Sequence, residues 1–116
     1  MGSSFRELVV WRRAIENTVA IYRLTSGFPS QEVYGLTSQL RRASVSVPSN
    51  IAEGYGRATS GEYKQFLGMA RGSNSEVETQ LVLAKELGFG DMGHIDQAAG
   101  LTAEVGKMLN TIMKSI

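Results

Sequence analysis

Four stretches of this sequence place apolar residues at alternating spacings of three and four, and short breaks containing glycine or proline separate them. Such spacing gathers apolar side chains on one face of an α-helix, whereas a half-buried strand would need strict alternation. The breaks fall at residues 27–29, 54–56 and 88–93. We therefore predict an all-α fold, an antiparallel up-down-up-down bundle of four helices of roughly 20 to 28 residues each.

The first helix is predicted to open at Ser4, because Ser4 and Glu7 have the spacing of a capping box. Two apolar sets lie on neighbouring faces of this helix, so we expect more than one face of the helix to be buried. The first set, expected to be the buried stripe, comprises Leu8, Trp11, Ile15 and Tyr22, with Thr18 in the missing step. The second set comprises Val10, Ala14, Ile21 and Leu24.

The other three helices are predicted from similar signals. The second starts near Ser30 and is expected to kink or break at Pro48, with Ser44 or Ser46 satisfying the freed backbone groups. The third opens at Thr59, which forms a capping box with Glu62, and ends at Gly88. Its small-residue stretch, residues 68–75, is expected to let another backbone come close. The fourth helix starts at about residue 93.

Length and composition favour one cytoplasmic domain. The 116 residues fit a single hydrophobic core, so residues 1–116 are interpreted as one domain. The absence of cysteine excludes disulfides and thiolate metal sites and suits a reducing compartment. The segment Met1–Arg6 has no apolar stretch of the kind a secretion signal needs, and no run approaches the roughly 20 apolar residues of a membrane span. We expect no membrane association.

Nothing in the sequence favours an enzyme. Residues 88–93 spell the glycine fingerprint of dinucleotide-binding folds, but a helix rather than a strand precedes them, so we interpret them as an interhelical turn with Gly88 as a helix cap and Asp91 as a possible N-cap. The only histidine, His94, has no glutamate three residues before it, which argues against a di-iron site. One histidine and no cysteine also leave little for a base-activated nucleophile. No cofactor, metal or catalytic residue is predicted.

Polar residues interrupt the apolar pattern of the second and third helices. They are Arg41, Arg42, Asn50, Glu53, Glu76 and Glu78. One interpretation is a solvated edge with ordinary ion pairs. The other is a buried or interfacial network in which Arg41 or Arg42 pairs with one of the three glutamates and sets register or partner choice. Glu76 and Glu78 are about 200° apart around a helix, so both cannot serve one pocket.

The net charge is only +1, but the charge is unevenly distributed. Residues 1–72 carry nine Lys/Arg and five Asp/Glu, and residues 73–116 carry three and six. The uneven charge could serve packing between helices of opposite charge. It could also provide a positive surface that binds phosphates. The cations that we select as candidates for nucleic-acid contact are Arg12, Arg13, Arg57, Lys64 and Arg71. Tyr55 and Tyr63 lie beside two of them, a mixture that suits single-stranded nucleic acid.

The chain resembles a known family through two blocks that straddle a proline. These blocks are Leu36 to Ala43 and Ser46 to Gly54, and the likeness continues through Glu62, Tyr63, Phe66 and residues 70–78. They resemble the bacterial 23S rRNA intervening-sequence proteins, a likeness that implies a homopentamer of four-helix bundles. The chain is also similar to the accessory protein of diversity-generating retroelements, a basic pentamer that works with a reverse transcriptase and nucleic acid. The near-neutral charge departs from that pattern.

Two functions follow as hypotheses. The first is a non-enzymatic oligomeric scaffold that binds RNA or DNA through basic patches. The alternative is a structural or protein-interaction oligomer without a nucleic-acid role. The expected partners are further copies of the chain, with RNA, DNA, a reverse transcriptase or another protein as candidates.

Overall fold

The computed structural model describes residues 4–116, and Met1, Gly2 and Ser3 of the segment considered above lie outside them. The described chain is all-α and contains no strand. Its helices are α1 (Val9–Thr25), α2 (Leu36–Tyr55), α3 (Ser60–Leu87) and α4 (Met92–Ser115), with short 3-10 helices η1 (Phe5–Glu7) and η2 (Ser30–Glu32). The prediction of four helices in an all-α bundle is confirmed.

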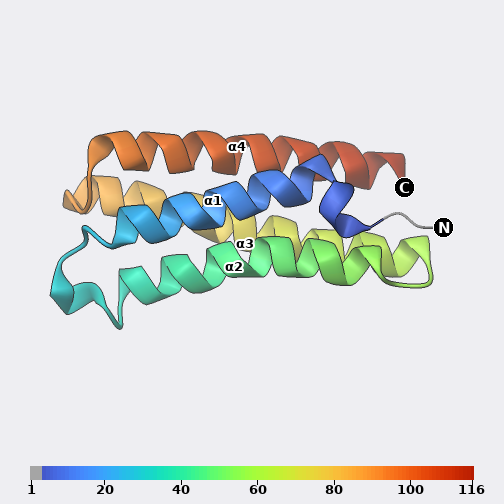
Figure 1. Cartoon of the computed structure of the whole chain (residues 1–116), viewed down its shortest axis with the longest axis horizontal. Coiled ribbons are helices and arrows are strands. Elements are labelled where there is room, and N and C mark those ends of the chain that lie inside the picture. Colours follow the sequence, from blue (N-terminus) through green and yellow to red (C-terminus); the bar gives the residue numbers. More distant parts are fainter. Residues whose placement is uncertain (1–3) are drawn as a thin grey trace.

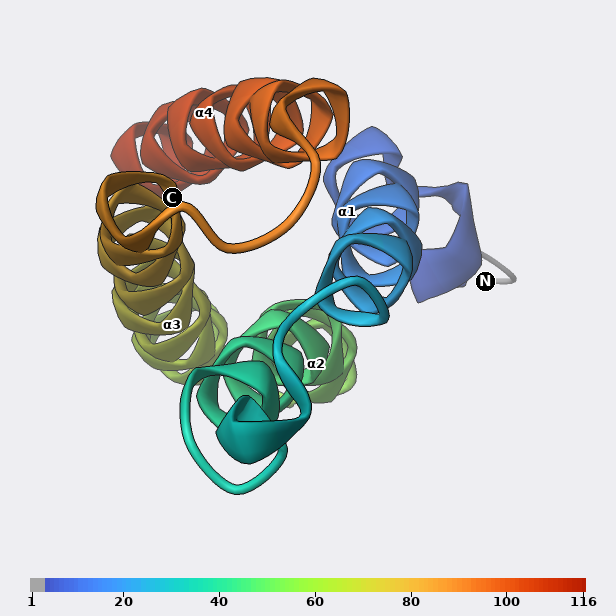
Figure 2. The same cartoon turned by 90° about the vertical axis from the view of Figure 1, so that its left-hand side faces the viewer.

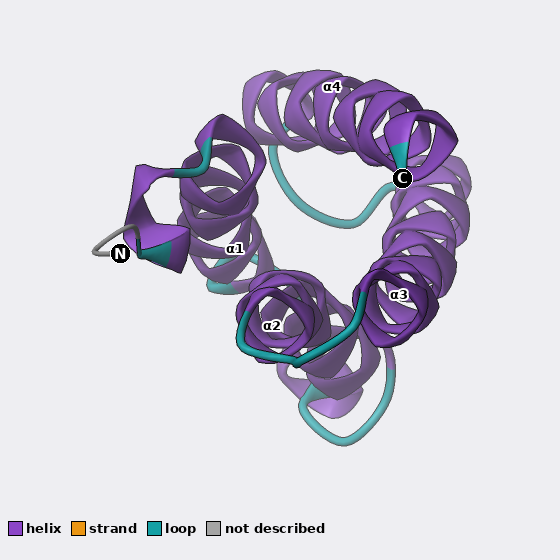
Figure 3. Ribbon diagram, turned by 90° about the vertical axis from the view of Figure 1, so that its right-hand side faces the viewer, coloured by secondary structure: helices purple, strands orange, loops and turns teal. Residues whose placement is uncertain are grey.

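The four helices surround a common core (Figures 2 and 3). α1 and α3 each pack against both α2 and α4, so α1 lies diagonally opposite α3. The connections α1–α2 and α3–α4 lie at one end of the bundle (Figure 1). The α2–α3 turn lies at the other end, together with the N-terminal segment and the end of α4. The first half of α1 and the first half of α3, although far apart in sequence, therefore contribute to the same apolar core cluster.

Local capping signals account for both ends of α3 and the start of α4. The Thr59 hydroxyl accepts a hydrogen bond from the Glu62 amide at 3.1 Å, as the capping box predicts. Gly88 ends α3 with φ 72°, a left-handed conformation that glycine adopts without a steric penalty. Asp91 caps α4 by accepting from the His94 amide at 3.0 Å. Residues 88–91 therefore form the predicted interhelical turn, and Met92 and Gly93 are already the first residues of α4.

Two predicted helix starts were wrong. Ser4 caps η1 instead of α1, because Leu8 is extended and separates η1 from the α-helix, which begins at Val9. α2 begins at Leu36 rather than near Ser30, because only one 3-10 turn forms at residues 30–32. The Glu32 carboxylate accepts from the Leu36 amide at 3.0 Å and so satisfies an otherwise unpaired backbone donor at the start of α2.

The buried stripe of α1 is the second apolar set rather than the first. Val10, Ala14, Ile21 and Leu24 are at most 2% exposed, whereas Ile15 is 37% and Tyr22 is 42% exposed. Trp11, expected in the core, is half-buried at the edge of a core cluster. Both sets satisfy helical periodicity, so the choice depends on where α2 and α4 pack, which the sequence of α1 alone does not specify.

A layer of polar residues divides the core into two apolar clusters. The Asn17 Nδ2 of α1 donates to the Thr102 hydroxyl of α4 at 2.8 Å, and the Asn74 Nδ2 of α3 donates to the Thr102 carbonyl at 2.9 Å. Ser44 of α2 is buried at the same level. The apolar clusters on the two sides of this layer share no residue. Sequence analysis missed the layer, although Asn17, Asn74 and Thr102 each occupy a step in an apolar stripe.

The close approach of α2 and α3 depends on a glycine outside the predicted small-residue stretch. A Cβ atom on Gly54 would lie 2.7 Å from Phe66 Cβ and 3.2 Å from the Tyr63 carbonyl oxygen. Any larger residue at position 54 would therefore force these helices apart. Within the predicted stretch, Gly72 instead faces solvent, and a Cβ there would meet no atom within 4 Å.

Candidate interaction surfaces

Apolar side chains are exposed on one side of the bundle, along α1 and α2. We define the α1–α2 face as the exposed residues Ile15, Val19, Tyr22 and Val45, together with Trp11 and the buried Pro48, which line the groove beside them. Ile15 is 37%, Val19 44% and Val45 41% exposed. A groove of about 350 Å³ runs between the two helices, with Trp11 and Ile15 on one wall and Pro48 and Ala52 on the other. Trp11, Ile15 and Tyr22 of the predicted buried stripe thus lie on this face instead of in the core.

Pro48 contributes to this face without breaking α2, which continues to Tyr55. Because proline has no amide hydrogen, the carbonyl of Ser44 loses its usual helical partner. The Thr18 hydroxyl of α1 lies 2.9 Å from that carbonyl oxygen and 3.0 Å from the Ala14 carbonyl oxygen. The Ala14 carbonyl keeps a backbone donor within α1, so we assign the Thr18 proton to Ser44. The predicted break, and the predicted compensation by Ser44 or Ser46, were therefore wrong.

Arg41 borders the α1–α2 face and lacks the carboxylate partner that we predicted. Its Nε donates to the Thr25 hydroxyl at 2.8 Å and its Nη2 to the Tyr22 carbonyl at 3.4 Å. Its guanidinium carbon lies 4.5 Å from the centroid of the Tyr22 ring. No ion pair involves Arg41 in residues 4–116. The negative end of α1 and an aromatic face take the place of a carboxylate.

Arg42 and Glu76 from the predicted network face one polar groove between α2 and α3. This groove of about 450 Å³ is also lined by Ser46, Ser73 and Gln80. The Ser73 hydroxyl donates to the Ser46 hydroxyl at 2.9 Å across the helix pair. Arg42 and Glu76 are both exposed and form no ion pair within the described chain. Arg42 and Glu76 therefore line the same groove without forming an ion pair with each other.

The remaining members of the predicted network lie elsewhere. Asn50 donates to the Ser46 hydroxyl at 2.9 Å within α2. Glu53 pairs with Arg57 at 2.7 Å, at the end of α2. Glu78 lines a separate pocket of about 210 Å³ between α3 and α4, on a different side from Glu76. The residues therefore do not form one buried network within a copy, and no glutamate of residues 4–116 forms an ion pair with Arg41 or Arg42.

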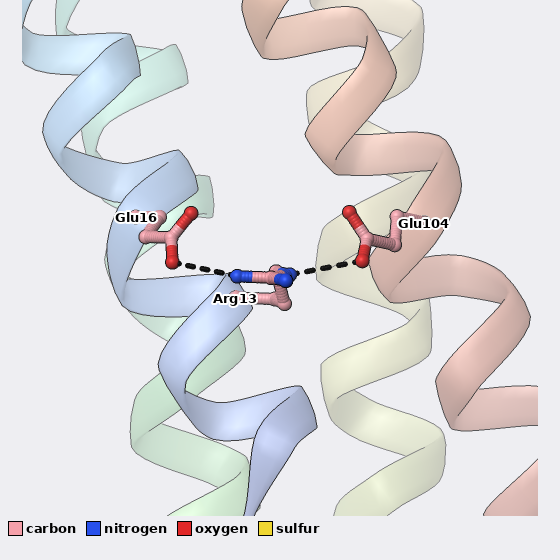
Figure 4. Close-up of polar contacts among 3 residues, drawn as sticks. All are labelled: Arg13, Glu16 and Glu104. Carbon is pink, nitrogen blue, oxygen red and sulfur yellow. Dashed lines mark hydrogen bonds and ion pairs between the residues drawn. The ribbon is translucent and has the colours of Figure 1, made fainter.

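Arg13, a candidate for phosphate contact, joins α1 to α4 (Figure 4). Its Nε lies 2.9 Å from a Glu104 oxygen and its Nη1 lies 2.8 Å from a Glu16 oxygen. The hydrogen bond to Glu104, followed by the charge of Glu16, raises the pKa of Arg13 above its ordinary value. Two carboxylates therefore compete with any phosphate for this guanidinium.

The other four candidate cations are spread around the bundle rather than gathered on one face. Arg12 donates to the carbonyls of Arg6 and Glu7 and so fastens η1 to α1. Arg57 pairs with Glu53 and lies over the Phe66 ring. Lys64 is exposed on the first turns of α3. Arg71 donates to Asn110 of α4 at 3.2 Å.

Two tyrosines accompany the cations at the α2–α3 turn. The rings of Tyr55 and Tyr63 meet edge to face with centroids 5.9 Å apart. Partial burial raises the pKa of the Tyr63 hydroxyl. The two rings pack against each other, and Tyr63 also contacts the apolar core cluster, so neither ring is simply a free stacking platform.

The polar layer also divides the charges of the bundle. The half that contains residues 4–16, 46–73 and 104–116 carries eight Lys/Arg and five Asp/Glu. The other half carries four and six. The chain is therefore positive at the end with the α2–α3 turn and negative at the end with the α1–α2 and α3–α4 connections (Figure 1). The difference in charge between the two ends is somewhat smaller than the difference between residues 1–72 and residues 73–116.

Neither metal ligands nor a membrane-spanning helix can be identified in residues 4–116. No three potential ligands from His, Cys, Asp and Glu cluster there. His94 is exposed, and its Nδ1 lies 3.2 Å from Asp91. None of the helices in this region combines the length and hydropathy required to cross a bilayer.

Comparisons with known proteins identify a family from the sequence and a similar fold among solved structures. No curated protein matches the chain. A crystal structure of a protein of unknown function from the S23 ribosomal protein family of Bacteroides thetaiotaomicron VPI-5482 has the same fold, with a TM-score of 0.84 at 22% identity. The match covers 91% of this chain and 99% of that one. The profile of the 23S rRNA-intervening sequence proteins matches residues 6–111. The chain therefore belongs to the 23S rRNA-intervening sequence protein family.

Proposed function

We propose that this protein is a non-enzymatic building block of a homo-oligomeric scaffold. Each copy is an antiparallel up-down-up-down bundle, and five copies is the number that the resemblance described above implies. The observation that carries the proposal is the α1–α2 face, where Ile15, Val19 and Val45 are 37 to 44% exposed beside an apolar groove. Contiguous exposed apolar surface of this kind is typical of a protein contact.

A second copy of the chain is the partner that best fits this face. A chain of 116 residues buries a modest core, and this core is further divided by a polar layer, so burial between copies adds stability that one copy lacks. Most soluble oligomers are assemblies of identical chains. We place the assembly in the cytoplasm, in keeping with the absence of cysteine.

Replacement of one exposed valine tests the proposal. Val45→Glu puts a charge into the α1–α2 face without removing a buried side chain, so the bundle should fold while assembly is lost. Val33→Glu is the matched control, because Val33 is 54% exposed and lies outside that face. Light scattering should give the mass of a single chain for Val45→Glu and the wild-type mass for Val33→Glu. Equal masses for Val45→Glu and wild type would contradict the proposal.

Nucleic-acid binding is a second candidate function, favoured by the excess of cations in the half of the bundle with the α2–α3 turn. Arg57 lies in the α2–α3 turn and Lys64 near the start of α3, both are exposed, and several copies in one assembly would repeat the same weak contact. Carboxylate pairing of Arg13 and Arg57 opposes this function. The likeness to retroelement accessory proteins adds a reverse transcriptase as a candidate protein partner.

A further inference from the structure

An exposed stripe with helical spacing runs along the outer side of α3. We define the α3 face as Met69, Gly72, Glu76, Thr79, Leu83 and Leu87. The spacings are three, four, three, four and four, so the side chains lie along one line of the helix. Met69 is 51%, Leu83 47% and Leu87 59% exposed. A stripe with this period is typical of a helix that packs on another helix, but no element of the described chain covers it.

Gly72, the second residue of this stripe, is not required to be glycine by any contact within the described chain. Glycine in a helix interior costs about 1 kcal/mol relative to alanine. At Gly54 the neighbouring helix requires the missing side chain, whereas a Cβ on Gly72 would meet nothing within 4 Å. A backbone from another molecule that approaches α3 at this position would account for the glycine.

The carboxylate nearest to Gly72 on this face also has no ion-pair partner. Glu76 forms no ion pair in residues 4–116. Gln80 lines the same shallow groove of about 340 Å³, but its unpaired Oε1 is buried, so Glu76 is the acceptor of the two that a partner can reach. The carboxylate of Glu76 is exposed and only accepts hydrogen bonds, so a partner of the α3 face should supply cationic donors beside it.

The α1–α2 face has the complementary properties. It is apolar along Ile15, Val19 and Val45, and the cation Arg41 borders it. Arg23, on the outer surface of α1, is also exposed. An apolar surface edged by guanidinium groups matches an apolar stripe with an unpaired carboxylate at its centre.

We propose that the α3 face of one copy receives the α1–α2 face of a second copy. This inference rests on the proposed self-assembly and specifies how it occurs. α1 and α3 occupy opposite corners of the bundle, so the two faces are different patches on different sides (Figure 2). Contacts between unlike patches run head to tail and generate a ring when the rotation closes, whereas a two-fold dimer would pair like with like.

Two exposed glycines supply a matched test. Gly72→Arg fills the α3 face, while Gly100→Arg makes the same change on α4, where a Cβ would also meet nothing within 4 Å. The exposed large apolar residues of α4 are confined to its ends, Met92 and Ile116, so Gly100 lies on no comparable stripe. Both variants should remain helical in circular dichroism, because arginine is a better helix former than glycine.

Sedimentation velocity should then separate the two glycine variants. Gly72→Arg should raise the dissociation constant of assembly by at least about tenfold, corresponding to about 1.4 kcal/mol, and Gly100→Arg should assemble like wild type. Leu83→Ser, which shortens an exposed side chain of the same face, should weaken assembly as well. Wild-type assembly by Gly72→Arg and Leu83→Ser, or equal loss in Gly100→Arg, would overturn the assignment of the α3 face. A monomeric wild type would instead overturn self-assembly itself.

A mixture of two variants tests whether these two faces meet each other. Val45→Glu keeps an intact α3 face, and Gly72→Arg keeps an intact α1–α2 face. Neither should assemble alone, but together they should form a species of two copies held by one intact contact, and growth should stop there. A mixture that stays at the mass of one chain, at concentrations where wild type assembles fully, would show that the faces are not partners.

Discussion

The hydroxyl of Thr18 on α1 lies 2.9 Å from the carbonyl oxygen of Ser44 on α2, the carbonyl that Pro48 deprives of its helical donor. A proline in the interior of a helix removes one backbone hydrogen bond and is expected to kink or break the helix. Here a neighbouring helix supplies the missing donor, and α2 continues to Tyr55. The groove of the α1–α2 face is therefore built around a hydrogen bond that links its two walls.

Removal of the Thr18 hydroxyl should expose this dependence. Thr18→Val leaves the Ser44 carbonyl without a donor and should lower the free energy of unfolding by about 1 kcal/mol, whereas Thr18→Ser should lower it by less. In a Pro48→Ala background the restored amide can donate to Ser44, so the cost of Thr18→Val should fall below about 0.5 kcal/mol. Urea denaturation at one fixed protein concentration measures this double-mutant cycle. Equal costs in both backgrounds would refute the role assigned to Thr18.

Neighbouring arginines on α2 should behave differently when replaced. Arg41→Met removes hydrogen bonds to Thr25 and to the Tyr22 carbonyl, as well as a cation–π contact, and should cost about 1 to 3 kcal/mol of stability. Arg42→Met removes no interaction recorded within residues 4–116 and should change stability by less than about 0.5 kcal/mol. Thermal or urea unfolding of both variants is the measurement. A larger loss from Arg42→Met than from Arg41→Met would contradict this account.

The candidate nucleic-acid function predicts binding that tolerates sequence and weakens steeply with salt, because phosphate contacts release counterions. A labelled single-stranded RNA and a duplex DNA should each be titrated at about 50 and 200 mM salt. If Lys64 contacts a phosphate, Lys64→Ala should reduce the slope of the logarithm of the binding constant against the logarithm of the salt concentration by about one unit. Lys85→Ala, at the negative end of the bundle, is the matched control and should leave the slope unchanged. No binding at the lower salt with the assembly intact would favour the protein-interaction function.

Sequence reasoning succeeded where the determinants are local. The caps at Thr59, Gly88 and Asp91 follow from side chains and glycine within a few residues of each helix end. The buried stripe of α1 could not be chosen in this way, since two apolar sets both have helical spacing and the packing of α2 and α4 selects one. The polar layer was detectable in principle, because Asn17 and Asn74 occupy steps of apolar stripes.

The candidate sites show the same limit. Arg41 was identified as a cation that needs a partner, but its partner is the end of α1, whose position depends on the assembled fold. Arg13 was predicted to be available for phosphate, but in the fold it is paired with Glu104 of α4, which lies 91 positions away in the sequence. The α1–α2 face escaped recognition as a surface because its residues have the periodicity of a core. Helical spacing of apolar residues identifies a face that should be buried. It does not say whether the same chain or another copy buries that face.

Self-assembly is the central claim, and sedimentation equilibrium of the wild-type chain at micromolar concentration tests it most directly. The account predicts a mass that is a multiple of the 12.6 kDa chain, and close to five times that value if the family resemblance extends to the number of copies. A single species of 12.6 kDa across the concentration range would contradict it.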